Sequence, residues 1–307
     1  MSTTSGLVQE LYSDIVADLQ AYYDDAVLLP NPQIISQQFN IAGTSGNTIN
    51  VPLTNAYTPA GLVGEGNSIL SGGGLAGDVS NANDFNPTQA QIVMTKKGTG
   101  TDVTEEALED GGMAVVRNAV LTRLSRGLAQ ATDEAGFTAM KSGFDATDYG
   151  VGGLTTAFTT NFVFSPEAMA YGAKRDPQVS MFFDNDLDQH EFRGTVRNGF
   201  ASLRAGFGAR VTSEKVIGAE TAANLTNIAR AVAALRSENA PGMLNGAYIA
   251  IIDSALEYSI ASQLNSVTTT AIGDLSVIGN RALLTGLIGQ AAGCEFYRSN
   301  NLPDATV

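Results

Sequence analysis

Three aspartates spaced two residues apart precede the single histidine of the chain. Asp184, Asp186 and Asp188 alternate as in the first half of a calcium-binding EF-hand loop. Such a loop continues with glycine at its sixth position and glutamate at its twelfth, where this chain has Gln189 and Thr195. The tight turn and the bidentate ligand are therefore both missing, and we expect a solvated acidic loop.

His190 and Cys294 each occur alone. A zinc site takes about four His or Cys ligands, which these two residues cannot supply. A hydrolase that uses His190 in a Ser-His-Asp triad is an alternative, but the chain has no Gly-x-Ser-x-Gly elbow. We therefore expect His190 to be a surface residue beside acids. A lone cysteine forms no internal disulfide, fits a reducing cytoplasm, and is more often buried packing than a nucleophile.

Two glycine clusters could be taken for phosphate-binding loops. Gly72-Gly73-Gly74 and Gly206-Phe207-Gly208 have neither a following Lys-Ser/Thr pair nor a correctly spaced third glycine, so we interpret both as flexible turns. The chain thus shows no convincing acid–base, metal or phosphate-binding constellation. We predict that it is not an enzyme and that it takes no cofactor and no metal.

Basic residues gather in one local segment. It contains Arg193, Arg197, Arg204 and Arg210, with no acid between Phe192 and Ser213. Contact with nucleic acid is one interpretation, but only two phenylalanines accompany the arginines as stacking platforms. Residues 1–95 contain eight acids and no Lys or Arg, so they offer a partner of opposite charge. We favour arginine–carboxylate pairing within or between subunits.

The composition also suggests an assembly. Charged residues make up only 16% of the chain, against about 25% in typical soluble proteins, and charge is depleted in the cores of interfaces. The formal net charge of −14 argues against wrapping nucleic acid by neutralising phosphates. The N-terminal segment has no secretory signal, and the longest apolar run, Ala247–Ile252, is far shorter than the ~20 residues of a membrane span.

The N-terminal third predicts an arm and two strands. Apolar residues recur every four positions from Leu7 to Leu19, which indicates a helix that Pro30 and Pro32 stop. Residues 48–55 and 89–95 each alternate between apolar and polar side chains, as half-buried strands do. More than thirty Gly-, Ser- and Asn-rich residues separate them. We interpret this arrangement as an extended hairpin.

The remainder of the chain predicts helices mixed with strands, so the fold class is α+β. A capping box at 102–105 predicts a first helix start, and a long helix should follow over 113–140. Its apolar face is predicted to contain Val116, Val120, Leu124, Leu128, Ala131, Ala135 and Ala139. Ser165-Pro166-Glu167 predicts a helix to about Lys174. Residues 193–216 predict strands, with turns at Gly199 and 206–208.

Towards the C-terminus, the apolar spacing from Leu225 to Leu235 predicts a helix that ends before Pro241-Gly242. Ala247–Ile252 predicts a buried strand. Asp253 or Ser254 should cap a further helix that contains Leu256, Ile260 and Leu264.

This order of elements resembles the major capsid proteins of tailed bacteriophages, of the Hong Kong phage type. The resemblance rests on VPLTNAYTPAGLVGEGNSIL and IVMTKKGTGTDVTEEALED for the extended E-loop and spine-helix entry, and on FSPEAMAYGAKRD for the peripheral-domain helix. It also rests on ALRSENAPG, AYIAII and FYRSNNLP for the axial domain, which in the family precedes the FSPEA segment. The resemblance implies an N-terminal arm (1–46), strands and E-loop (47–100), a peripheral domain with the spine helix (101–220) and an axial domain (221–307).

The same resemblance implies a function. Hexamers and pentamers would form an icosahedral shell around double-stranded DNA, which is held without sequence-specific binding, in a virion assembled in the host cytoplasm. Separate scaffolding, portal and cement or decoration proteins are implied, and no membrane. The expected assembly residues are Gly61, Leu62, Val63, Glu65, Ile69, Leu70, Arg193, Arg197, Arg204 and Arg210. An encapsulin-like nanocompartment shell and an extracellular surface-layer protein are the alternatives.

Deletion of Gly61–Gly77 tests the hairpin interpretation. The segment contains seven glycines and few large apolar residues, so it can add little to a core of its own. We expect the shortened protein to keep its circular dichroism spectrum and melting temperature but to form no stable shells in electron micrographs. Unfolding of the variant would place the segment in the core, and normal shells would show that it is dispensable.

Overall fold

The computed structural model describes residues 2–43, 45–53, 88–149, 158–184, 189–214, 225–266 and 289–305. Its α+β content follows the predicted class. The chain divides into two compact units, residues 49–91 and the remainder, and each is described by itself.

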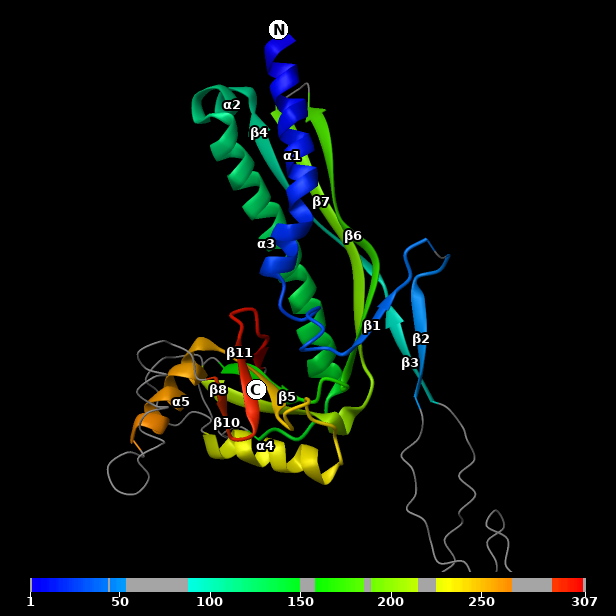
Figure 1. Ribbon diagram of the computed structural model, residues 1–307, viewed down its shortest axis with the longest axis vertical. Helices are drawn as coiled ribbons and strands as arrows, with labels where there is room; N and C mark the ends of the chain where they lie inside the picture. The colour runs from blue at the N-terminus through cyan, green and yellow to red at the C-terminus, as the bar shows by residue number, and fades with distance from the viewer. Residues whose placement is uncertain are drawn as a thin grey trace, which may run out of the picture. The chain divides into compact units, whose positions relative to one another are not determined.

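The helices, labelled in Figure 1, are α1 (Ser2–Ala26), α2 (Glu105–Gly111), α3 (Met113–Gly143), α4 (Leu225–Ser237) and α5 (Ser254–Ser266), with a short 3₁₀ turn at Ala205–Phe207. The strands are β1 (Gln37–Asn40), β2 (Thr48–Leu53), β3 (Thr88–Val93), β4 (Thr95–Thr104), β5 (Phe158–Phe164), β6 (Met169–Asp184), β7 (Gln189–Ser202), β8 (Gly208–Glu214), β9 (Tyr248–Ile252), β10 (Gln290–Ala291), β11 (Cys294–Arg298) and β12 (Asp304–Ala305).

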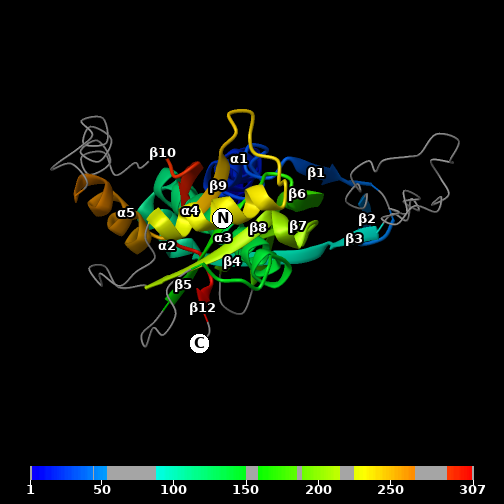
Figure 2. The same ribbon diagram turned by 90° about the horizontal axis from the view of Figure 1, so that it is seen from below.

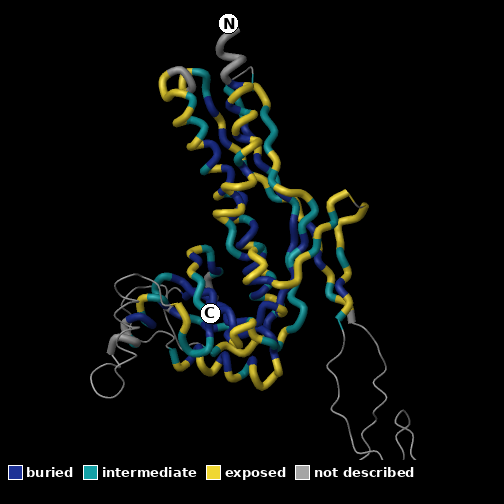
Figure 3. Tube along the Cα trace, in the orientation of Figure 1, coloured by how far each residue is buried: buried dark blue, intermediate teal, exposed yellow. Residues whose placement is uncertain are grey.

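The first helix forms where the apolar spacing predicts it. Val8, Leu11, Ile15, Leu19 and Tyr23 are all buried along one side of α1. This stripe packs against α3 and β6, so tertiary contacts hold the helix from Val8 to Tyr23. Figure 3 marks the buried positions along the trace of α1.

The long helix α3 is confirmed, and it extends three residues beyond the predicted end. Its buried stripe departs from the predicted one, because positions four apart advance by more than one turn of 3.6 residues. Ala131, Ala135 and Ala139 are therefore only half-buried, while Phe137 and Met140 are fully buried in their place.

The capping box predicted at 102–105 is wrong by two residues. Asp102 and Val103 belong to β4, and the cap of α2 is Thr104, whose hydroxyl accepts from the backbone N–H of Ala107 at 3.2 Å. Pairing of β4 with β7 continues through Thr104, which delays the start of the helix. Gly112 separates the two helices and adopts φ of 72° there, a conformation that favours glycine.

Four strands form one sheet in the order β1-β6-β7-β4. Strands β6 and β7 are antiparallel, β4 is antiparallel to β7, and β1 lies parallel to β6. Helix α1 packs on β6 while α3 packs on β7 and β4, so both helices contact this sheet.

The helix predicted from Ser165 to Lys174 is wrong. Ser165 does accept from the N–H of Glu167 at 3.3 Å, but only one turn closes, through Ala168 N–H to the Ser165 carbonyl at 2.9 Å. The chain then continues as β6, which finds backbone partners on both sides in β1 and β7. The two ladders of hydrogen bonds outweigh the local helix-start signal. The peripheral-domain helix that the resemblance implied for FSPEAMAYGAKRD is therefore also wrong, because most of this segment belongs to β6.

The turn predicted at Gly199 is also wrong. Gly199 lies inside β7, opposite Gly172 of β6. A β-carbon at Gly199 would collide with the carbonyl of Val93, so the glycine serves a close backbone approach. The turn predicted at 206–208 is confirmed by the 3₁₀ turn that leads into β8.

A second sheet has the order β10-β11-β9-β5-β12, and β8 pairs with β5. Every residue of β5 and β9 is buried, and β9 is the buried strand that the apolar run at 247–252 predicts. Helix α4 lies beside β8 (Figure 2), and α5 also contacts β8. The two helices bury Ile228, Val232, Leu235, Leu256 and Ile260 in the same cluster. Asp253 caps α5 as predicted, by accepting from the N–H of Leu256 at 2.8 Å.

The two strands predicted to frame the hairpin are present. Strands β2 and β3 pair with each other, and β2 alternates in burial with Val51 as its buried residue. Residues 54–87 between them lie outside the described residues.

Substitution of Gly199 tests the close approach. Alanine would force the Val93 carbonyl away from β7, and overpacking of this kind costs about 1–3 kcal/mol in the free energy of unfolding. Gly100→Ala is the matched control, because the nearest atom to its new β-carbon would lie at an ordinary 3.5 Å. Urea denaturation should show a lower free energy of unfolding for Gly199→Ala, and an unchanged one for Gly100→Ala. Equal stability of the two variants would contradict the packing described here.

Candidate functional site

A chain of buried polar side chains joins α1, α3, β4 and β7. The Asn198 amide donates to the Thr132 hydroxyl at 3.2 Å and to the Tyr23 hydroxyl at 3.4 Å. The Tyr23 hydroxyl in turn donates to the Thr132 hydroxyl at 3.1 Å, and the Lys97 ammonium contacts the side-chain oxygen of Asn198. Each side chain comes from a different element, so the network fixes the two helices against the two strands.

Asp133 lies beside this network on α3 and is 3% exposed. Its carboxylate accepts from the backbone N–H of Leu29 at 3.0 Å and of Leu28 at 3.1 Å, where the chain leaves α1. Burial raises the pKa of Asp133 to about 6, although these hydrogen bonds and the charge of Lys97 oppose the shift. Burial also lowers the pKa of Lys97 to about 8. Both side chains therefore titrate near neutral pH.

Arg193 lies on an exposed part of the four-stranded sheet. Its guanidinium pairs with Glu191 two residues earlier on β7, with Nε 2.6 Å from the carboxylate. It also lies 4.9 Å from the centre of the Phe182 ring. Phe182 is 51% exposed and Phe183 46% exposed. Phe182 and Arg193 thus form a mixed apolar and basic surface near the ends of β6 and β7, which we call the Phe182 surface. Phe183 lies on the opposite face of the strand, against His190.

The other three predicted arginines contact their own chain. Arg197 donates to the Asn47 side chain at 2.6 Å, and Arg204 lies 5.0 Å above the Phe207 ring. Arg210 donates to the carbonyl of Asp145 at 2.9 Å and to that of Lys141 at 3.4 Å. Arg210 therefore satisfies carbonyls at the C-terminal end of α3.

An ion-pair cluster that the sequence interpretation missed joins the two long helices. Arg117 of α3 contacts Asp18 of α1 and lies 3.5 Å from Asp14. The two aspartates are four residues apart and so lie on one side of α1. The sequence did contain a signal for this cluster. Asp14 and Asp18 have the spacing of one helix face, and Arg117 directly follows Val116, a residue of the predicted apolar face of the other helix.

His190 is not the surface residue that the sequence suggested, since its side chain is only 11% exposed. Its ring lies tilted by 44° against the Phe183 ring with centroids 4.8 Å apart, and Nε2 lies 3.9 Å from a Glu105 oxygen. His190 lies between Val103 of β4 and Phe183 of β6 in the sheet, so the neighbouring strands reduce its exposure. Cys294 is fully buried as predicted, and burial raises the pKa of its thiol to about 12, so it stays protonated.

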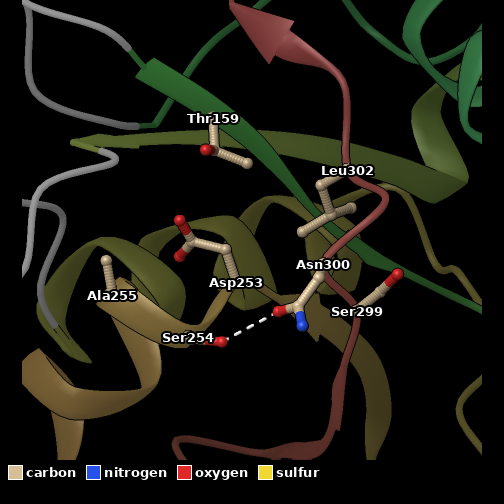
Figure 4. Close-up of a pocket in the computed structure, with 7 residues that line it drawn as sticks. All are labelled: Thr159, Asp253, Ser254, Ala255, Ser299, Asn300 and Leu302. Atoms are coloured by element: carbon tan, nitrogen blue, oxygen red, sulfur yellow. Dashed lines mark hydrogen bonds between the residues drawn. The ribbon is translucent and has the colours of Figure 1, made fainter.

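A small pocket of about 190 Å³ lies at the start of α5 (Figure 4). It is lined by Thr159, Asp253, Ser254, Ala255, Ser299, Asn300 and Leu302. The polar groups there serve the fold: Asp253 caps α5, and the Ser254 hydroxyl bonds the Asn300 side chain at 2.9 Å. Burial raises the pKa of Asp253.

Several predicted features cannot be placed. The six expected loop residues, Gly61, Leu62, Val63, Glu65, Ile69 and Leu70, lie outside the described residues, as do Asp186 and Asp188 of the acidic loop and the 72–74 glycine cluster. Over the part of the chain that is described, no group of three or more His, Cys, Asp or Glu could hold a metal ion. None of the described helices is both long and apolar enough to cross a membrane.

Comparison with known proteins identifies the fold. No family model matches the sequence, and no curated protein matches it. Among solved structures, the chain is similar to the capsid of bacteriophage JBD30 decorated with minor capsid protein trimers, with a TM-score of 0.51, 12% identity, and coverage of 90% of this chain and 91% of that one. The JBD30 procapsid gives a TM-score of 0.48 at 12% identity, over 84% and 90% of the two chains.

A virus-like particle from Pyrococcus furiosus gives a TM-score of 0.43 at 9% identity, over 66% of this chain and 99% of that one. The likeness to the decorated JBD30 capsid spans nearly the whole of both chains, so the chain has the fold of a phage major capsid protein.

The raised pKa of Asp133 predicts a pH-dependent stability. A folded-state pKa of about 6 against about 4 when unfolded means that the folded protein binds this proton more tightly. The resulting stability is fully present below about pH 4 and is lost as pH rises through 6. Asp133→Asn removes the titration but keeps an oxygen that can accept from Leu28 and Leu29.

Urea denaturation of both proteins between pH 4 and pH 7 measures this effect. The stability of the wild type minus that of Asp133→Asn should fall by about 3 kcal/mol over this range. A difference that does not change with pH would contradict the assignment of the shift to Asp133.

Proposed function

We propose that the protein is a major capsid protein that assembles into an icosahedral shell around double-stranded DNA. The likeness to the JBD30 capsid over 90% of the chain carries the proposal. A subunit that makes heterologous contacts closes into rings when the rotation permits, and hexamers and pentamers together close a shell. The net charge of −14 supports packaging without adhesion, because an acidic wall repels phosphates.

The role is structural and not enzymatic in this proposal. The titratable groups of the described core serve packing: Asp253 and Asp133 cap backbone, and Cys294 is protonated in an apolar cluster. The shell would belong to a virion assembled in the host cytoplasm. Scaffolding and portal proteins would act as partners, together with a decoration protein such as the minor capsid protein trimers named for the JBD30 capsid.

The Phe182 surface is the proposed subunit contact among the described residues. An exposed aromatic ring beside an arginine is typical of the residues that dominate interface energies. Arg193 forms an ion pair with Glu191 of its own strand, so its charge is already partly balanced. Arg193 and the Phe182 ring beside it can therefore be buried against a neighbouring subunit without leaving an unpaired charge. Arg197, Arg204, Arg210 and the 61–70 loop residues complete the proposed assembly set.

Sedimentation velocity of the purified protein tests this proposal. The wild type should sediment as large closed particles under assembly conditions, with scaffold supplied where needed. Arg193→Ala combined with Phe182→Ala should shift the protein to small species while the melting temperature stays nearly unchanged, because exposed substitutions change stability by about 0.5 kcal/mol.

Arg126→Ala is the control, since it removes one positive charge from an exposed position on α3. Its particles should match those of the wild type. A wild-type protein that stays monomeric in every assembly condition would overturn the function, and normal assembly of the double variant would overturn only the Phe182 surface.

A further inference from the structure

A tight turn between α4 and β9 exposes an apolar side chain at its tip. The Gly246 N–H donates to the carbonyl of Met243 at 2.7 Å, and the Met243 N–H donates to the carbonyl of Ala247 at 2.8 Å. Leu244 and Asn245 are therefore the two central residues of a closed turn, and Leu244 is fully exposed. Figure 2 shows the segment between α4 and β9 as a loop that stands out from both elements.

The backbone of this turn is held in one shape. Gly246 adopts φ of 75°, which favours glycine, and a β-carbon at Gly242 would lie 3.0 Å from the backbone of Gly246. At the base of the loop, the Tyr248 hydroxyl donates to the Ala240 carbonyl at 2.8 Å. Turn tips usually carry Gly, Pro, Asn, Asp or Ser, so a leucine exposed on a preformed turn indicates a contact with another molecule.

The pocket at the start of α5 lies at the opposite end of the same strands. Strands β9 and β11 are parallel, and their first residues, Tyr248 and Cys294, lie opposite each other. The turn directly precedes β9, whereas most of the pocket's lining residues directly follow β9 and β11 (Figure 4). The five residues of β9 span about 17 Å, so Leu244 cannot reach the pocket of its own chain.

The pocket has room for an apolar side chain of this size. Its volume is about 190 Å³, and a cavity of about 150 Å³ accepts a benzene molecule. Leu302 and Ala255 contribute carbon atoms to its wall. The polar residues beside them already have partners, since Asp253 accepts from the backbone of α5 and Ser254 bonds Asn300. Covering these paired groups with an apolar side chain therefore costs little.

We propose that Leu244 of one copy of this chain inserts into the pocket at the start of α5 of a neighbouring copy. Because the turn and the pocket lie at opposite ends of β9, the contact is head-to-tail, and each subunit supplies one turn and one pocket. Contacts of this kind close into rings when the rotation permits. The inference rests on the proposed shell function, and it names the contact that joins neighbouring subunits within a hexamer or pentamer.

The protein concentration above which particles form, measured by sedimentation velocity, tests the importance of Leu244. Leu244→Ser should raise this concentration about thirtyfold, because the contact loses the burial of one leucine side chain. Leu244→Met is the matched control, since it keeps the volume and apolar character of the side chain and should leave the concentration nearly unchanged. Both variants should keep the wild-type melting temperature, because residue 244 is exposed in the free subunit.

Cysteine cross-linking of assembled particles tests which surface Leu244 meets. The double variant Leu244→Cys with Ala255→Cys, oxidised after assembly, should give a ladder of covalent oligomers of up to six subunits on a non-reducing gel. The two positions are too far apart to pair within one chain, so every cross-link joins two copies. Each single variant should stay monomeric on the gel, although it contains the buried Cys294.

The possible failures are distinguishable. If the wild type forms shells and Leu244→Ser forms them at the same concentration, this contact is wrong and the proposed function stands. Dimers from the Leu244→Cys single variant would show that two turns meet each other, and normal particles of the double variant without a ladder would show that the turn does not meet the pocket; either result would overturn the contact. A wild-type protein that forms no particles would overturn both the contact and the function.

Discussion

The packing of α3 against both α1 and the four-stranded sheet is the packing on which the larger unit depends. Val120, Leu124 and Leu128 belong to one hydrophobic cluster, which they share with α1 and the sheet. Phe137 and Met140 belong to another, which includes both sheets and helices α4 and α5. Because one continuous helix contributes to both clusters, displacement of α3 would disturb both together.

Polar residues lie where the two clusters meet. Thr132 and Asp133 follow the last leucine of the first cluster on α3 and precede the first phenylalanine of the second. Buried polar groups cost free energy unless they are hydrogen-bonded, and here the bonds reach Tyr23, Asn198 and the backbone after α1. The network therefore fixes the alignment of α1, α3 and β7. Apolar packing alone would fix that alignment less tightly, because it has no directional contacts.

The sequence predicted the elements whose signals are local. Helices α1, α3 and α4, strand β9 and the Asp253 cap all follow from apolar spacing or from a capping residue next to the helix it starts. Strand β6 was predicted as a helix because the start signal at Ser165 is local, whereas the strand depends on pairing with β1, far earlier in the sequence, and with β7, the strand that follows. The polar network was missed for the same reason, since Asn198 lies 66 positions from Thr132 and 101 from Lys97.

Cryo-electron microscopy of the assembled protein tests the central claim, that this fold builds a closed shell. The account predicts particles with icosahedral symmetry in which the subunits cluster in fives and sixes. Each subunit should show α3 as a continuous rod of density, with α1 and the four-stranded sheet against it. Monomers alone, or open fibres without fivefold clusters, would contradict it.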